Sequence, residues 1–280
     1  MYPVLVEVFG ISISSYGVSK ALAVLAAAFL LTREFRRLGW DPDPAATIVV
    51  ATAVLGFLGA KLYYLAEHAD SFSVHHLGGA GFTWYGGMLA GLPTYVLLAR
   101  RHHLPLATTA AVTAAPLSVA YGIGRLGCFF AGDGSYGPPS DLPWAVAFPN
   151  GMVPTTVPVH PTALYEAFVA FAIAAVLWRV RTRWHPYATV GAYALLTGVA
   201  RFLAEFVRIN DDALFGLTQP QLWSLLLALF GVAALVAAAR QPRSDPSSNH
   251  LTDRSVEHHS NDTTSTVTVG RPSPPDVGGR

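Results

Sequence analysis

Long runs of apolar residues alternate with short polar stretches along the first 240 residues of the chain. A run of about 17 to 25 apolar residues is long enough to cross a lipid bilayer as a helix. Seven such segments lie at residues 14–31, 45–66, 82–99, 107–130, 163–178, 187–206 and 220–239. The pattern therefore predicts an all-α polytopic membrane protein with seven transmembrane helices.

Arginines gather in alternate connections between these segments. They follow the first, third, fifth and seventh segments, at Arg33, Arg36, Arg37, Arg100, Arg101, Arg179, Arg181, Arg183, Arg240 and Arg243. The connections at the opposite ends hold only Arg208. Because positively charged loops stay on the cytoplasmic side of a membrane, the sequence predicts an N-terminus outside and a C-terminus in the cytoplasm.

Composition agrees with a membrane protein. Hydrophobic residues make up 52% of the chain, charged residues 12%, and the mean hydropathy is +0.41, whereas soluble domains carry about 25% charged residues. No basic stripe of the kind that binds nucleic acid is present. The segment Met1–Gly10 has no positive charge and contains Glu7, so we do not expect a cleaved signal peptide.

Residues 241–280 differ from the rest of the chain. They are rich in Ser, Thr, Pro, Asp and Gly and contain no aromatic residue. Such a segment cannot bury enough apolar surface to offset the entropy that ordering costs. The sequence thus predicts a membrane domain over residues 1–240, followed by a disordered cytoplasmic tail without a catalytic role.

Ionisable and polar residues of the apolar segments collect at their predicted outer ends. These residues include Tyr16, Lys20, Tyr85, Arg125, Glu166, Arg201 and Glu205. Transporters commonly place their polar site near the bilayer midplane, whereas these residues lie at the depth of lipid headgroups. The pattern favours an enzyme or receptor that handles a phospholipid headgroup or a partner at the outer leaflet, and it disfavours a small-solute transporter.

Two arginines carry most of this signal. Arg201 and Glu205 are four residues apart and share a helix face, so they form either a structural ion pair or a phosphate contact in which Glu205 orients Arg201. Arg125 either reaches to the interface or faces an anion. The neighbouring Gly124 and Gly127 favour the second interpretation, because glycine lets the backbone approach a ligand closely.

The remaining candidates have simpler alternatives. Tyr16 and Tyr85 fit an aromatic belt at the membrane surface, and Glu166 fits the favourable charge at a helix start. His160, which precedes Pro161, fits a residue that fixes a helix start. Cys128, the single cysteine, is of a type more often buried as a small apolar residue than used as a nucleophile. We predict no metal site, because the histidine pairs lack a third ligand.

Short motifs follow one another in a fixed order between residues 10 and 240. They are Ser15-Tyr16-Gly17, Trp84-Tyr85-Gly86-Gly87, Gly124-Arg125-Leu126-Gly127-Cys128-Phe129, Asp141-Leu142-Pro143-Trp144, His160-Pro161-Thr162-Ala163-Leu164-Tyr165-Glu166 and Arg201-Phe202-Leu203-Ala204-Glu205-Phe206. In these motifs the chain resembles the prolipoprotein diacylglyceryl transferases, which are bacterial membrane enzymes.

The resemblance implies transfer of a diacylglyceryl group from phosphatidylglycerol to the lipobox cysteine of a prolipoprotein, with release of glycerol phosphate and without a cofactor. It implies a place in the bacterial cytoplasmic membrane, with the active site toward the outer side. Arg125 and Arg201 would contact phosphate, and Glu205 would position Arg201. Tyr85, His160, Glu205 or the phosphate itself would take the proton of the thiol.

The resemblance also implies a lipid cavity. Its lining residues would be Tyr16, Gly86, Gly87, Gly124, Gly127, Cys128, Asp133, Gly137 and Glu166. The chain departs from the best-known pattern at three positions, where Tyr85 replaces a histidine, Cys128 an asparagine and Asp133 a glutamate. Tyr85 and Cys128 keep open a second interpretation, a non-catalytic paralogue that binds lipids or lipoprotein precursors.

Overall fold

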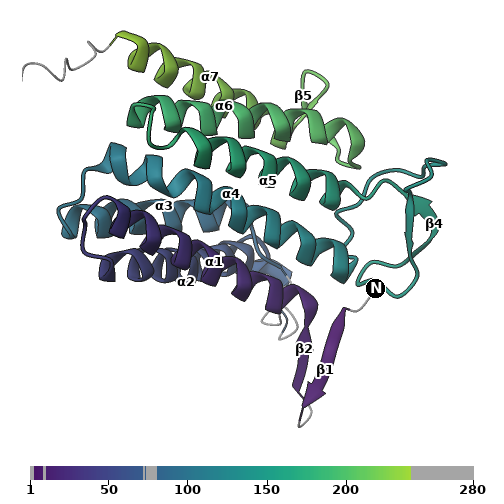
Figure 1. Cartoon of the computed structure of the whole chain (residues 1–280). Helices are drawn as coiled ribbons and strands as arrows, with labels where there is room; N and C mark the ends of the chain where they lie inside the picture. The colour runs from purple at the N-terminus through teal and green to yellow at the C-terminus, as the bar shows by residue number, and fades with distance from the viewer. Residues whose placement is uncertain (1–2, 9–10, 72, 74–80, 241–280) are drawn as a thin grey trace, which may run out of the picture. The chain divides into compact units, whose positions relative to one another are not determined.

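The computed structural model describes residues 3–8, 11–71, 73 and 81–240, and this part of the chain is mostly helical (Figure 1). The helices are α1 (Ser15–Arg37), α2 (Asp43–Glu67), α3 (Trp84–Arg101), α4 (Leu106–Ala131), α5 (Thr162–Val180), α6 (Pro186–Ala204) and α7 (Gln219–Arg240). Each one covers a predicted apolar segment, which confirms the helical pattern. The predicted tail at 241–280 lies outside the described residues, as does part of the segment Met1–Gly10.

Among the described residues, six helices are long and apolar enough to cross a membrane. The remaining described helix, α3, does not meet this requirement for length and apolarity. Its 18 residues include Pro93, Arg100 and Arg101. These residues and the glycines at its start lower the average apolarity of the helix. The described chain is a multi-pass membrane protein with mostly helical structure.

Local capping explains where several helices begin and end. Ser14 Oγ accepts the Gly17 N–H at 3.0 Å and caps α1, as hydroxyl side chains do at helix starts. α4 ends at Gly132, whose positive φ of 58° suits a glycine and whose N–H donates to the Cys128 carbonyl at 3.0 Å. This cap turns the chain so that Asp133 lies beside the Cys128 thiol.

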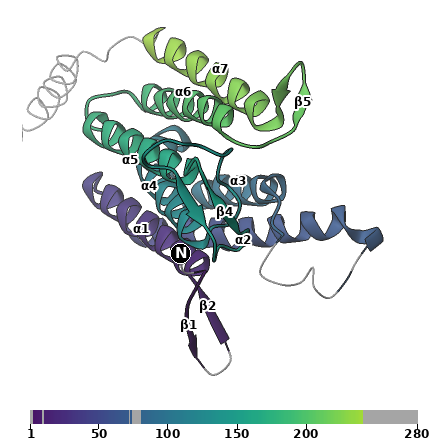
Figure 2. The same ribbon diagram turned by 90° about the vertical axis from the view of Figure 1, so that its right-hand side faces the viewer.

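α4 is the central helix of the bundle. It packs against α1, α5 and α6, while α2 pairs with α3 and α6 pairs with α7 (Figures 1 and 2). One buried cluster, around Leu31, Phe35 and Ile48, joins α1, α2 and α4. A second cluster, which includes Ile173 and Leu177, joins α4, α5 and α6. Both clusters hold α4 in place.

Glycines set the distance between the paired helices. A Cβ atom on Gly86 would lie 2.3 Å from the carbonyl oxygen of Gly59, and one on Gly191 would lie 2.8 Å from that of Gly231. Small residues allow this close approach of helix backbones in membrane proteins. Any larger residue at these positions would push α2 from α3, or α6 from α7.

In the described part of the chain, three small antiparallel sheets correct the all-α expectation. They pair β1 (Val4–Val8) with β2 (Ile11–Ser14), β3 (Val146–Phe148) with β4 (Thr155–Val159), and β5 (Asp212–Leu214) with β6 (Leu217–Thr218). The strands are too short to give a clear alternation of apolar and polar residues. All of these hairpins lie beyond the same ends of the helices (Figure 1), and Figure 2 looks onto that end.

The opposite end of the bundle holds a buried ion-pair cluster that the sequence did not suggest. Glu34 is 1% exposed and accepts from Arg37 Nη2 at 2.7 Å and from Arg181 Nε at 2.9 Å. The guanidinium of Arg181 also stacks 4.1 Å from the centre of the Trp178 ring. Arg37 thus forms an ion pair within α1, and Arg181 ties α1 to the end of α5.

Candidate active site

The carboxylate of Glu166, near the start of α5, lies at the centre of a cluster of three arginines. Arg125 Nη2 is 2.8 Å from Oε2, Arg208 Nη1 is 2.8 Å from Oε1, and Arg201 Nη1 is 3.4 Å from Oε1. The side chain of Glu166 is 4% exposed. A carboxylate this deeply buried requires charged and hydrogen-bonding partners, and three separate segments of the chain supply them.

Glu205 is the second buried carboxylate of the cluster and stands in η3 (Glu205–Val207), a 3-10 turn that continues α6. Its Oε2 is 3.0 Å from Arg201 Nη2. Its Oε1 accepts hydrogen bonds from Thr218 Oγ1 at 3.1 Å and from the side-chain amide of Asn210. Arg208 Nε lies 3.8 Å away, too far for a hydrogen bond. Since its side chain is fully buried, Glu205 serves to hold Arg201 and the segment after α6.

The cluster carries an excess of positive charge. Its three guanidinium groups face two carboxylates, so one positive charge is not matched within the cluster. Charges in a partly water-excluded site attract more strongly than charges in bulk water. The arrangement therefore favours the binding of one monoanion, which is the charge of a phosphodiester.

Arg125 is the arginine of the cluster that reaches toward Cys128. Its Nη2 contacts Glu166, and its Nε donates at 3.0 Å to the hydroxyl of Tyr121, which itself donates to Glu166. Its Nη1 has only a 4.0 Å contact with Cys128 Sγ. In Arg201, by contrast, both terminal nitrogens contact carboxylates. Arg125 is thus held rigidly along one edge and presents the other edge toward Cys128.

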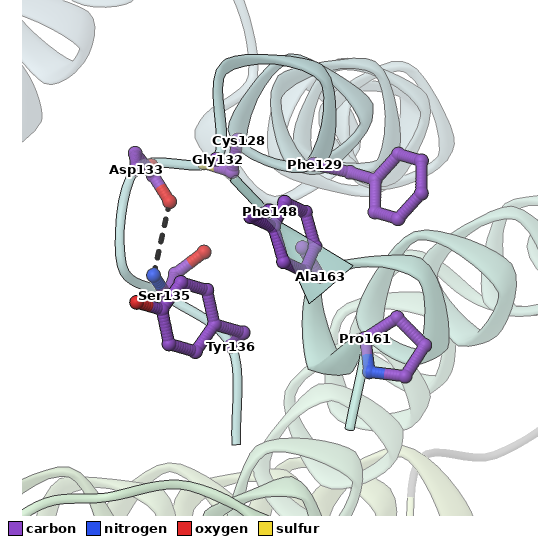
Figure 3. A pocket seen from close by; sticks show the side chains of 9 residues that line it. All are labelled: Cys128, Phe129, Gly132, Asp133, Ser135, Tyr136, Phe148, Pro161 and Ala163. Carbon is purple, nitrogen blue, oxygen red and sulfur yellow. Dashed lines mark hydrogen bonds between the residues drawn. The ribbon is translucent and has the colours of Figure 1, made fainter. Parts of the chain in front are cut away.

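A small pocket opens beside Cys128 (Figure 3). It is lined by Cys128, Phe129, Gly132, Asp133, Ser135, Tyr136, Phe148, Pro161 and Ala163. Asp133 accepts the Ser135 N–H at 3.0 Å, which fixes its carboxylate over the pocket (Figure 3). Tyr16 on α1 interacts electrostatically with Cys128, Asp133 and Arg125. The structure therefore groups the predicted residues Tyr16, Cys128 and Asp133 near the edge of Arg125 that faces Cys128.

Two predicted catalytic residues have their contacts elsewhere. The ring of Tyr85 lies 6.4 Å from that of Tyr63 and 6.1 Å from that of Trp223, within an aromatic group that links α2, α3 and α7. His160 Nδ1 lies 3.4 Å from the hydroxyl of Tyr165. Among the described contacts, neither Tyr85 nor His160 touches an arginine of the cluster.

Several predicted glycines serve close packing. A Cβ on Gly127 would lie 2.4 Å from Ser19 Cβ, and one on Gly137 would lie 2.1 Å from the Val207 carbonyl oxygen. Gly127 thus lets α1 approach α4, and Gly137 lets the loop after α4 approach η3. These contacts bring Tyr16 and the Glu205 turn toward the cluster.

The two paired glycines at the start of α3 differ from each other. Gly86 is the closest point of α3 to α2, as described above, whereas a Cβ on Gly87 would lie an ordinary 3.5 Å from the Gly56 carbonyl oxygen. In the described structure, both residues face α2. They therefore shape the α2–α3 pair that carries Tyr85.

Two residues of the cluster were not among the predicted site residues. Arg208 is three residues after Glu205 and seven after Arg201, and Tyr121 is four residues before Arg125. Residues at these spacings lie on one helix face. Extending each motif by one helical turn would have found both of them.

Comparison with known proteins agrees with this geometry. The sequence profile of the family described as prolipoprotein diacylglyceryl transferase matches residues 3–237. The chain belongs to the prolipoprotein diacylglyceryl transferase family. The matched range contains every arginine and glutamate of the cluster, the pocket beside Cys128 and all three hairpins.

Curated members of this transferase family resemble the chain over most of their length. The phosphatidylglycerol–prolipoprotein diacylglyceryl transferase of Clostridium tetani is 31% identical over 214 residues, covering 74% of this chain and 86% of that protein. The enzyme of the same name from Pseudomonas paraeruginosa is 30% identical over 259 residues, covering 87% and 96%. That from Geobacter sulfurreducens is 31% identical over 240 residues, covering 81% and 91%.

Proposed function

We propose that the protein transfers the diacylglyceryl group of phosphatidylglycerol to the lipobox cysteine of prolipoproteins and releases glycerol phosphate. The observation that carries the proposal is the arginine cluster around Glu166 with its single unmatched positive charge. Curated relatives with this activity in their names match between 74% and 87% of the chain.

In the proposed reaction, the sulfur of the client cysteine attacks the diacylglyceryl carbon that bears the phosphate. A carbon–sulfur bond forms and the carbon–oxygen bond to phosphate breaks. The electron pair of the broken bond and, in the overall balance, the thiol proton end on glycerol phosphate. Negative charge grows on the phosphate as the bond breaks, so donors fixed beside it stabilise the transition state more than the ground state.

The three arginines have different roles in stabilising the negative charge on the phosphate. Arg125 contacts the phosphate through Nη1, because its other two nitrogens are held by Glu166 and Tyr121. Arg201 and Arg208 act mainly through Glu166 and Glu205, to which their nitrogens are bound. In this proposal Glu205 is a positioning residue rather than the base, since it is fully buried and occupied by Arg201, Thr218 and Asn210.

We further propose seven crossings of the bacterial cytoplasmic membrane, with the N-terminus and the active site on the outer side. The support for α3 as a seventh crossing is its length of 18 residues and its pairing with α2. The support for the orientation is the collection of arginines at the end of the bundle opposite the hairpins. Phosphatidylglycerol would then reach the cluster from the outer leaflet.

The test is a transfer assay with purified protein, phosphatidylglycerol and a synthetic lipobox peptide. Mass spectrometry is expected to show the gain of one diacylglyceryl group on the peptide cysteine, lost in Arg125→Ala. Arg183→Ala serves as the matched control, because Arg183 lies in the turn before α6 at the other end of the bundle. A well-folded protein that modifies no peptide would favour the non-catalytic binding paralogue instead.

A further inference from the structure

Lys20 is a cation inside the bundle that the proposed function leaves unused. It lies on the face of α1 that packs against α4, in line with the buried residues Ala23 and Ala27. Its Nζ lies 3.5 Å from the point where a Cβ on Gly124 would stand. The ammonium group therefore rests over the backbone of α4 one residue before Arg125.

The described residues place no carboxylate oxygen within the 4.0 Å of an ion pair around Lys20 Nζ. Its Nζ instead makes a cation–π contact with the ring of Tyr16, whose centre lies 4.8 Å away. Asp133 acts on the ammonium only at longer range and is already bound to the Ser135 N–H, while Arg125 is a like charge. A half-buried cation without a counterion is costly, which points to an anion from outside the chain.

The chemistry around Lys20 indicates which anion fits. Arg125 Nη1 has no carboxylate partner among the described contacts and lies 4.0 Å from Cys128 Sγ, and Lys20 interacts electrostatically with both of these residues. Because Gly124 has no side chain, the Lys20 ammonium group can lie against the backbone of α4 next to Arg125. A guanidinium edge and an ammonium group that face one space form a favourable site for a phosphate.

We propose that Lys20 is a second phosphate-binding residue, which holds the phosphodiester of the lipid substrate together with Arg125 and selects anionic lipids. The proposal rests on the proposed function for the identity of that lipid. Phosphatidylglycerol places an uncharged glycerol beyond its phosphate. A phosphatidylethanolamine head would bring a second ammonium group beside Lys20, and such repulsion is a common source of specificity.

Kinetics test this assignment through a comparison of lysine variants. Lys20→Met keeps the length of the side chain and removes its charge. We expect the KM for phosphatidylglycerol to rise about tenfold, because one charge-assisted hydrogen bond is lost. The kcat should change less than the KM. Lys20→Arg should restore most of this loss. Lys61→Met is the matched control, because Lys61 is the other lysine of the chain and also stands over aromatic rings. An unchanged KM and an unchanged preference for phosphatidylglycerol over phosphatidylethanolamine in Lys20→Met would overturn the proposal.

A binding test separates this inference from catalysis. In lipid nanodiscs without peptide, amine acetylation read by mass spectrometry should be slower at Lys20 with phosphatidylglycerol than with phosphatidylcholine, and equal at Lys61. Inorganic phosphate added to phosphatidylcholine discs should protect Lys20 less, because it lacks acyl chains. Protection of Lys20 by phosphatidylglycerol in a protein that transfers nothing would retain this proposal and reject the proposed function. Protection by inorganic phosphate alone would reject the lipid assignment.

Discussion

Replacing Glu166 by Gln is the most direct perturbation of the arginine cluster. The change keeps the shape of the side chain but removes the charge that Arg125 and Arg208 contact at 2.8 Å each. A charge-assisted hydrogen bond contributes about 1.5 to 3 kcal/mol. Because these arginines keep 18% and 14% exposure, we take the lower end, which gives a loss of about 3 kcal/mol for the two contacts.

This value agrees with the general cost of removing one partner from a buried ion pair, about 3 to 5 kcal/mol. For a domain of this size, such a loss lowers the unfolding midpoint by roughly 6 to 12 °C. Arg125 would also lose the contact that fixes its orientation, so transfer should fall by about 100-fold, which is the usual effect of losing one aligned donor.

The measurement combines thermal unfolding in detergent with the peptide transfer assay. Glu67→Gln is the matched control, since Glu67 lies at the same end of the bundle but is exposed and, among the described residues, accepts a hydrogen bond from Thr83 only. A surface change of this kind should alter stability by less than about 0.5 kcal/mol. If Glu166→Gln unfolds and transfers as the unaltered protein does, the central role given to Glu166 is wrong.

Four further outcomes are expected. Glu34→Gln should lower the unfolding midpoint, because it leaves Arg181 without its buried carboxylate, yet transfer at a temperature well below that midpoint should stay within about twofold of the unaltered rate. Arg125→Lys should insert normally but transfer about 10- to 100-fold more slowly, since lysine lacks the planar fork that binds Glu166 and phosphate together. Gly86→Ala should destabilise the protein by about 1 to 3 kcal/mol in the same unfolding assay, because its Cβ would meet the backbone of α2. Deletion of residues 244–280 should leave transfer unchanged, and a large loss would contradict the prediction of a non-catalytic tail.

The sequence was sufficient for the helices because a helix that crosses a membrane needs a long apolar run, which is visible in the sequence. It was also sufficient for the Arg201–Glu205 pair, since partners four residues apart leave a local pattern, and the structure contains that ion pair at 3.0 Å. The structure thus contains the ion pair, which extends to Glu166, while the phosphate contact of Arg201 stays a prediction.

The sequence was not sufficient for the role of Glu166. Its partners Tyr121, Arg201 and Arg208 are 45, 35 and 42 residues away, and no periodic pattern links residues at such separations. Glu166 at a helix start was therefore open to a simpler explanation by the helix dipole. The hairpins were missed for a related reason, because strands of two to five residues are too short to show a period of two.

The lengths of the connections have a consequence for how the chain assembles during its synthesis. At the arginine-rich end short turns join the helices, at residues 38–42, 102–105 and 181–185, so that α1 with α2, α3 with α4, and α5 with α6 are synthesised as joined pairs. Arg125 arrives with α4, one pair earlier than Glu166 on α5 and the end of α6. Until the third pair is in place, Arg125 has none of its carboxylate partners, and an arginine at this depth is costly. The polar centre of the protein is therefore completed only after the first four of the seven described helices have been synthesised.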